Sequence, residues 1–229
     1  MLLSNQKAVL LKQGEQTGTE IAKQIEYAGR TCWQSRNRIT EDSYIKFIQN
    51  LIARGHETPL EFADLSFDVR TSRTVLAELT RHRLASFQVE SQRYVLQNKQ
   101  VGALGNEGGG LVVITPEWFN SEFDSDTPIG DKEAAFQSAV AYVEMKYEML
   151  LEAGLKPEQA REVLPNCTAC NIIIKANCRE WRHFFSLRCA PNAYPPMRAL
   201  AKIMLKQAHD YVPVVFDDLY DKFITTEAD

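Results

Sequence analysis

The sequence predicts an α+β fold in which helices outnumber strands. Three observations lead to this prediction: several long segments carry apolar residues at helical spacing, a few short segments alternate or run apolar as strands do, and glycine or proline residues separate them. With 229 residues, 45% of them hydrophobic, the chain can bury a sizeable core. Because no linker divides it, we expect one domain over residues 1–229.

Two amphipathic helices are expected near the start of the chain, over residues 19–30 and 40–54. Thr19 and Thr40 are the expected N-caps, because a threonine hydroxyl accepts a hydrogen bond from a backbone N–H of the first helical turn. Gly55 is expected to end the second helix, since glycine readily adopts the left-handed conformation found after many helix C-termini.

Later segments alternate between strands and helices. Residues 65–69 alternate apolar and polar side chains as a half-buried strand does, and Ser72 is placed to cap a helix that ends before Arg81. Two further strands are expected over residues 111–115 and 168–176. The remaining helices are expected over residues 131–153, 157–164, 179–188, 197–211 and after Pro213. The first of these is expected to bury Ala135, Ala139, Tyr142, Val143, Tyr147, Leu150 and Leu151.

Neither the glycine-rich segment nor the cysteines and histidines match a known motif. Residues 97–110 are expected to form a loop, which lacks the Gly-Lys-Ser/Thr ending of a phosphate-binding loop and the spacing of a dinucleotide fingerprint. The five cysteines and four histidines show no spacing that identifies a metal site. We therefore expect no metal, and free thiols in a reducing compartment.

Charge and hydropathy narrow the class of protein. The net charge of −4 disfavours non-specific binding to nucleic acid. No apolar run approaches the roughly 18 residues of a membrane-spanning helix, and the first residues lack the order of a secretion signal. We expect a cytoplasmic protein with neither a membrane nor a nucleic-acid partner.

The most informative segment runs from Arg81 to Tyr94 and gathers three arginines, a histidine and two serines. A guanidinium offers paired donors to phosphate or carboxylate oxygens, and serine hydroxyls can complete such a site. Cations also stabilise a helix C-terminus by roughly 0.3–1 kcal/mol, so Arg81 alone could be a solvated helix end. The aromatic residues and the later cation, Arg93, instead favour binding of a phosphate ester or nucleotide.

A second group of arginines contains Arg161, Arg179 and Arg188. Arg179, Arg182 and His183 are spaced so that they share one face of a helix. For Arg182 we expect a surface charge that lies over aromatic neighbours. The helix ends that carry the two arginine groups could meet around one anionic ligand.

Together these segments resemble the flavin-dependent thymidylate synthases. Residues 81–83 (Arg-His-Arg), followed by Ser86, Ser91 and Arg93, match the hallmark of that family. Further matches keep the family's order along the chain, at residues 55–61, 161–165, 177–179 and 187–188. The resemblance implies a thymidylate-synthase-complementing-protein type fold, an antiparallel sheet packed with several helices. It also implies a homotetramer whose active sites are shared between subunits.

The resemblance implies that the enzyme converts dUMP to dTMP, with methylenetetrahydrofolate as carbon donor and FAD, reduced by NADPH, as hydride carrier. The flavin site would comprise Thr58, Glu61, Arg81, His82, Arg83, Asn177, Arg179 and His183. The nucleotide site would comprise Glu78, Arg81, Glu90, Ser91, Gln92, Arg93, Arg161 and Arg188. Arg188 is the expected activating residue, because a guanidinium can stabilise the negative charge that develops as N3 of the uracil ionises.

Two other functions stay open, one of them because the chain departs from the family pattern. Glu78 replaces a common glutamine, and Gln88 and Val89 replace a frequent Asn-Glu, with Glu90 one place later. One alternative is therefore a flavoenzyme of the same fold that acts on another pyrimidine nucleotide. The other is a non-enzymatic nucleotide or RNA-binding module, in which arginines bind phosphate and aromatic residues stack on bases.

Overall fold

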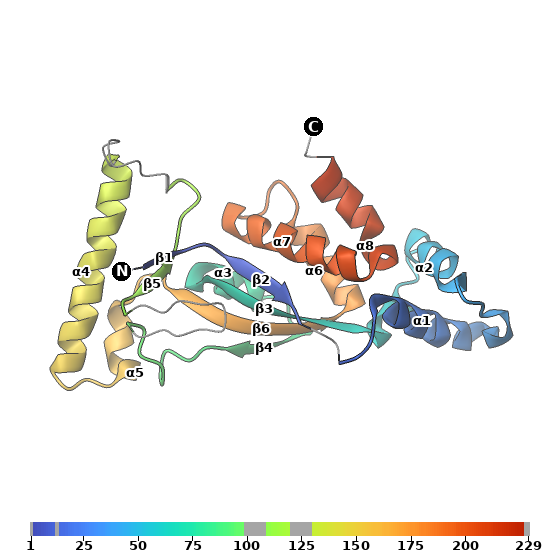
Figure 1. Cartoon of the computed structure of the whole chain (residues 1–229), viewed down its shortest axis with the longest axis horizontal. Helices are drawn as coiled ribbons and strands as arrows, with labels where there is room; N and C mark the ends of the chain where they lie inside the picture. The colour runs from blue at the N-terminus through green and yellow to red at the C-terminus, as the bar shows by residue number, and fades with distance from the viewer. Residues whose placement is uncertain (1, 12–13, 99–108, 120–129, 227–229) are drawn as a thin grey trace. The chain divides into compact units, whose positions relative to one another are not determined.

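The computed structural model describes residues 2–11, 14–98, 109–119 and 130–226 (Figure 1). The chain forms two compact units, each assembled from segments that lie far apart in sequence. Unit 1 comprises Met1–Lys7, Val69–Thr80 and Gln88–Ile172. Unit 2 comprises Ala8–Asp68, Arg81–Phe87 and Ile173–Asp229.

The main sheet is antiparallel, with four strands in the order β2-β3-β6-β4. Its strands are β2 (Lys7–Leu10), β3 (Asp64–Ser72), β4 (Ala85–Val89) and β6 (Ala169–Asn177). The strands expected over residues 65–69 and 168–176 are thus confirmed as β3 and β6. Strand β2 was not expected, since four residues are too few to reveal a period of two.

A second sheet in unit 1 pairs β1 (Leu2–Ser4) with β5 (Val112–Ile114) in parallel. The strand expected over residues 111–115 is confirmed as β5, whereas β1 was not expected. Neighbouring side chains of β5 belong to different apolar clusters. Val113 lies in a cluster with Val140, and Val112 lies in another with Ala169. Because successive strand residues point to opposite faces, this short strand is buried on both sides.

The helices of unit 1 begin close to where the sequence predicts. They are α3 (Arg73–Leu79), α4 (Asp131–Glu152) and α5 (Pro157–Ala160). Ser72 caps α3, because its hydroxyl accepts a hydrogen bond of 3.2 Å from the Val75 N–H. The prediction of an apolar stripe on α4 was partly wrong, because Ala135, Ala139 and Tyr142 are exposed. The buried residues of α4 are Glu133, Val140 and Tyr147, a narrower stripe with a seven-residue repeat.

The helices of unit 2 are α1 (Gly18–Gly29), α2 (Ser43–Ala53), α6 (Cys178–Arg188), α7 (Pro195–Tyr211) and α8 (Pro213–Tyr220). The N-cap of α1 is Thr17 rather than Thr19, because Glu20 completes a capping box with Thr17. Helix α2 begins after Asp42, so Thr40 does not cap it. Gly55, with φ of +67°, follows the end of α2 as predicted.

Among the described residues, short 3-10 turns and one π-helical turn complete the regular structure. They are η1 (Arg30–Trp33), η2 (Arg36–Arg38), η3 (Thr58–Phe62), η4 (Arg161–Val163) and the π turn η5 (Asp221–Thr225). The expected helix over residues 157–164 is therefore confirmed as two short pieces, α5 and η4.

An aromatic cluster fixes α6 against β3 within unit 2. The rings of Trp181 and Phe67 meet edge to face at 5.0 Å, and the Trp181 indole N–H donates to the Leu65 carbonyl at 3.0 Å. Phe184 and Phe185 pack against the same indole. Such aromatic pairs contribute about 0.5–1.5 kcal/mol each beyond their buried area, so the position of α6 is well determined.

Three further findings bear on the predictions above. The expected loop over residues 97–110 lies mostly outside the described residues. All five cysteines are free thiols, and burial raises the pKa of Cys170 to about 11 and that of Cys178 to about 12. Within the described residues, no helix is long and apolar enough to cross a membrane.

Candidate functional site

Unit 2 contains a cavity of about 690 Å³ beside α6 and η3. This volume falls within the range of small-molecule sites, about 300–1,000 Å³. The lining is mostly polar and includes Glu57, Glu61, Asn177, Arg179, Glu180, Arg182 and His183. Four of the residues expected to hold the flavin, namely Glu61, Asn177, Arg179 and His183, therefore come together at one cavity.

Helix α6 positions most of this lining. The Asn177 side chain accepts a hydrogen bond of 2.9 Å from the Glu180 N–H and so caps the helix. Arg179 in the first turn and His183 in the second are exposed side chains along one side of the helix, four residues apart. A helix N-terminus with an adjacent guanidinium is a favourable environment for an anion.

Arg182 has a different environment from the one the sequence suggests. We expected a surface charge, but Arg182 is buried and forms two parallel hydrogen bonds, of 2.7 and 2.8 Å, with the Asp218 carboxylate. It also donates to the Val215 carbonyl and lies 3.4 Å from Glu57. Burial alone would lower the pKa of Arg182, but Asp218 and Glu57 outweigh it and raise that pKa. Arg182 therefore links α6 to α8 as a permanently charged structural residue.

Arg179 forms a looser pair. Its guanidinium lies 2.5 Å from the Glu61 carboxylate, and both side chains are nearly half exposed. Exposed ion pairs contribute only about 0–1 kcal/mol, so an anionic ligand could replace Glu61 at little cost.

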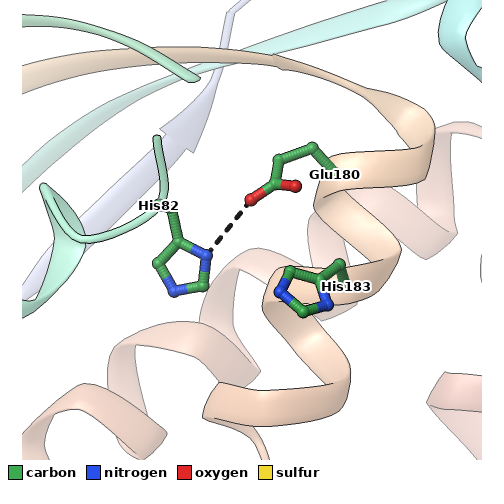
Figure 2. Close-up of side chains that lie close together, drawn as sticks. All are labelled: His82, Glu180 and His183. Carbon is green, nitrogen blue, oxygen red and sulfur yellow. Dashed lines mark hydrogen bonds and ion pairs between the residues drawn. The ribbon is translucent and has the colours of Figure 1, made fainter. Parts of the chain in front are cut away.

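His82 connects two residues of α6 inside unit 2, and Figure 2 shows its contact with the first of them, Glu180. Its Nδ1 lies 3.2 Å from Glu180 Oε1, and its Nε2 lies 3.0 Å from Arg188 Nε. The imidazole is buried and packs edge-on against the Phe184 ring at 4.9 Å. Burial lowers the pKa of His82 and the charge of Arg188 lowers it further, while Glu180 acts in the opposite direction. His82 is therefore mainly neutral at neutral pH.

The same cluster has ligand atoms of the kind that bind transition metals. One atom from each of His82, Glu180 and His183 lies within 4.8 Å of the others (Figure 2). The sequence analysis saw no such group, because 98 residues separate the first two members. However, His82 uses both ring nitrogens in hydrogen bonds, and the adjacent Arg188 guanidinium repels a cation. The arrangement is therefore that of a hydrogen-bond network.

Two of the nucleotide residues expected in unit 1, Arg93 and Arg161, lie near Glu158. Arg93 Nε donates to Glu158 Oε2 at 2.6 Å, and this pair together with Arg161 lowers the pKa of Glu158. The Ser91 hydroxyl accepts a hydrogen bond of 3.2 Å from the Arg93 N–H. Arg161 is exposed. The sequence analysis missed Glu158, although its position three residues before Arg161 places it on the same helical face.

The remaining predicted residues differ in their surroundings. The Glu90 carboxylate accepts hydrogen bonds from the Asn171 side chain at 2.7 Å and from the Gln97 side chain at 3.3 Å. Glu90 thereby links β6 to the segment that follows β4. Glu78 and Gln92 are half-buried in unit 1. In unit 2, Thr58 begins η3, and Arg81 and Arg83 are exposed beside the buried His82.

Comparison with known proteins gives a consistent set of relatives. A family model described as thymidylate synthase complementing protein matches residues 16–214. A flavin-dependent thymidylate synthase from Halobacterium salinarum is 34% identical, covering 78% of this chain and 76% of that protein. One from Geobacter sulfurreducens is 31% identical, covering 85% and 80%. One from Mycobacterium bovis is 34% identical, covering 90% and 81%.

Solved structures with a similar fold include a UMP/dUMP methylase, PolB, from Streptomyces cacaoi. Its complex with 5-Br dUMP superimposes with a TM-score of 0.73 at 24% identity, covering 97% of this chain and 98% of that one. Its complex with 5-Br UMP gives a TM-score of 0.72 at 22% identity, covering 97% of both chains. At this level of identity the similarity establishes the fold, and the predicted fold class is confirmed.

Proposed function

This chain belongs to the thymidylate synthase complementing protein family, and from that premise we propose that it methylates dUMP to dTMP with FAD as the redox cofactor. The observation that carries the proposal is the cavity of unit 2, which is lined by four of the eight residues expected for a flavin. Family membership supports the reaction, and the resemblance of the site motifs supports the residue assignments.

The residues of unit 2 fit a flavin dinucleotide. Its pyrophosphate needs cationic donors, and Arg179 lines the cavity while Arg81 and Arg83 lie in the same unit. Two of the three glutamates of the lining are ion-paired with arginines, Glu57 with Arg182 and Glu61 with Arg179. The third, Glu180, is buried and hydrogen-bonded to His82. When bound, the flavin supplies hydride transfer. Thr58, Asn177 and His183 would complete the proposed site.

We propose that the Arg93 region of unit 1 holds the nucleotide phosphate. Arg93 and Arg161 supply the cations, and Ser91 and Gln92 supply polar groups, with Glu78 and Glu90 nearby in sequence. A phosphate monoester carries a charge of about −1.5 to −2 at neutral pH, more than a carboxylate does. Arg93 would therefore exchange Glu158 for the phosphate of dUMP.

Arg188 is proposed to activate the pyrimidine. Its guanidinium would stabilise the negative charge that develops on the uracil ring when C5 becomes nucleophilic. Donors aimed at developing charge typically change the rate on the order of 10²–10³-fold. No nucleophilic side chain is needed for this step.

The remaining assignments follow from the resemblance. We propose methylenetetrahydrofolate as the carbon donor, NADPH as the reductant, and a homotetramer with shared active sites. We further propose a cytoplasmic enzyme formed by one catalytic domain over residues 1–229, supported by a family match that includes residues of both units.

Release of the C5 hydrogen tests the reaction, since methylation replaces that atom. The purified protein, given FAD, NADPH, methylenetetrahydrofolate and dUMP labelled with tritium at C5, is expected to release tritium to water. Failure to release it, in a protein that binds FAD, would exclude dUMP as the substrate.

A second candidate is methylation of UMP, or of both nucleotides. It is favoured by the departures at Glu78, Gln88 and Val89 and by the similarity to a UMP/dUMP methylase. The same assay with labelled UMP decides between the substrates. A protein that binds RNA but neither FAD nor dUMP would instead support the non-enzymatic alternative.

A further inference from the structure

We propose that Glu180 and His82 are positioning residues that hold the guanidinium of Arg188 in its working orientation. This inference rests on the function proposed above, in which Arg188 meets the pyrimidine ring. Glu180 belongs to neither of the residue sets that the family resemblance implies.

The hydrogen bonds fix where each proton lies. Arg188 Nε always carries a hydrogen and can only donate, so His82 Nε2, at 3.0 Å, must be the acceptor. The proton of the neutral imidazole then sits on Nδ1, from which it is donated to Glu180 Oε1 at 3.2 Å. Glu180 therefore selects the only neutral tautomer of His82 that can accept from Arg188.

The helix geometry supports this chain of contacts. Glu180, Phe184 and Arg188 are spaced at i, i+4 and i+8 on α6, so they line one face of that helix. His82 lies along this face, with its ring against Phe184 and one nitrogen toward each of the other two residues. The buried imidazole thus connects the first turn of α6 to its last residue.

The hydrogen bond from Arg188 Nε to His82 Nε2 also restricts the orientation of the guanidinium. The guanidinium is planar, so fixing Nε against a buried ring restricts the plane in which the two terminal amino groups lie. These amino groups are the part of arginine that can pair with a planar oxyanion such as an ionised pyrimidine. Restricting them before the substrate binds favours the transition state.

Neighbouring acidic residues do not duplicate this role. Of the other two carboxylates that line the cavity, Glu57 lies against Arg182 and Glu61 against Arg179. Glu180 is buried, with 7% of its surface exposed, and a buried carboxylate is costly unless it has a partner. His82 provides that partner.

Two substitutions separate the acceptor from the charge. Glu180→Gln keeps a carbonyl acceptor of similar size for His82 Nδ1–H, whereas Glu180→Leu removes the acceptor. We expect kcat for dUMP methylation to fall on the order of 10²-fold in Glu180→Leu and less in Glu180→Gln, with little change in KM for dUMP. Should the leucine variant not fold, the glutamine variant still distinguishes the outcomes, because its kcat is expected to lie below that of the wild type.

Glu133 offers a matched control. It is a buried glutamate at the same position of a helix, the third residue of α4, and belongs to neither predicted site. Glu133→Gln is expected to change stability at most, leaving kcat at the wild-type value.

Nitrogen NMR of histidine labelled with nitrogen-15 tests the network without any turnover. The wild-type spectrum is expected to show His82 protonated at Nδ1, and Glu180→Leu is expected to populate the Nε2-protonated form. A wild-type His82 protonated at Nε2, or a folded Glu180→Leu variant with unchanged kcat, would overturn the proposal. Absence of turnover in the wild type would instead count against the proposed function, while the NMR result still judges the network.

Discussion

Arg182 in unit 2 and Arg93 in unit 1 have opposite environments, although no local signal in the sequence distinguishes them. In unit 2, Arg182 is buried against Asp218 and Arg188 is held by His82. In unit 1, Arg93 is 57% exposed and pairs with Glu158 at the surface. Burial and the number of partners, rather than residue type, therefore separate a structural cation from one that can exchange its partner for a ligand.

The largest expected effect concerns Arg188. Arg188→Ala should lower kcat on the order of 10²–10³-fold while flavin remains bound, because it removes a donor to developing charge. Steady-state kinetics with FAD retention followed by visible absorbance measure both quantities. Arg188→Lys keeps the charge but loses the planar fork, so it should restore little of the rate. A fully active lysine variant would show that charge alone suffices.

The loss of stability when the carboxylate partner is removed should differ between Arg182 and Arg93. Asp218→Ala should lower the free energy of unfolding by about 3 kcal/mol, because it leaves the buried Arg182 with incomplete pairing. The matched substitution in unit 1, Glu158→Ala, should lower the free energy of unfolding far less, since that pair is exposed to solvent. Urea denaturation followed by circular dichroism measures both. Equal costs would mean that the two arginines are not different in kind.

Binding of dUMP should depend on the exposed Arg93. Arg93→Ala should weaken dUMP binding roughly 10- to 100-fold, the effect of losing a hydrogen bond between charged groups. Calorimetric titration with dUMP measures this change. Glu158→Gln, which removes a competitor for Arg93, should leave dUMP binding equal or tighter. An unchanged dUMP affinity in Arg93→Ala would place the phosphate elsewhere.

The smallest expected effect is a difference in pH dependence. His82 has a pKa below its ordinary value of 6.5 in the folded protein, so the unfolded state takes up its proton first and stability falls as pH drops below 6.5. Glu180, Arg188 and His183 are the charged or titratable groups that act on it. The loss of stability below pH 6.5 should be smaller in His82→Asn and unchanged in His56→Asn. Urea unfolding at several pH values around 6.5 measures both.

The stability contributed by the Arg93–Glu158 pair of unit 1 should change at a lower pH than that contributed by His82. Arg93 holds the pKa of Glu158 below its ordinary value of 4.5, so that pair stabilises the fold above 4.5 and is lost as pH falls through the folded pKa. Glu158→Gln should therefore alter the pH dependence only in the acidic range. A change near neutral pH in this variant would contradict the assignment.

Local signals in the sequence predicted much of the fold. Helix α6 was predictable from its aromatic residues at helical spacing. The role of Ser72 as a helix N-cap was predictable from its position before an apolar run. The cap of α1 was misplaced because Thr17 and Thr19 are both good caps, and only the pairing with Glu20 decides between them. Strand β1 was missed because three residues carry no readable period.

Long-range partners could not be read from the sequence. Nothing in the local pattern around Arg182 points to Asp218, which lies 36 residues later, so burial of that pair depends on how α8 packs against α6. His82 and Glu180 are 98 residues apart and meet for the same reason. The candidate residues were predictable from motif resemblance, whereas their hydrogen-bond partners depended on tertiary packing.

We propose that the cavity of unit 2 holds the flavin and that the Arg93 region of unit 1 does not. Titration of FAD into the apoprotein, followed by flavin fluorescence, tests this most directly. Arg179→Ala should weaken FAD binding by about tenfold or more, since it removes a charged hydrogen-bond donor, and Arg93→Ala should leave the FAD dissociation constant unchanged. Loss of FAD binding in Arg93→Ala with normal binding in Arg179→Ala would contradict the account.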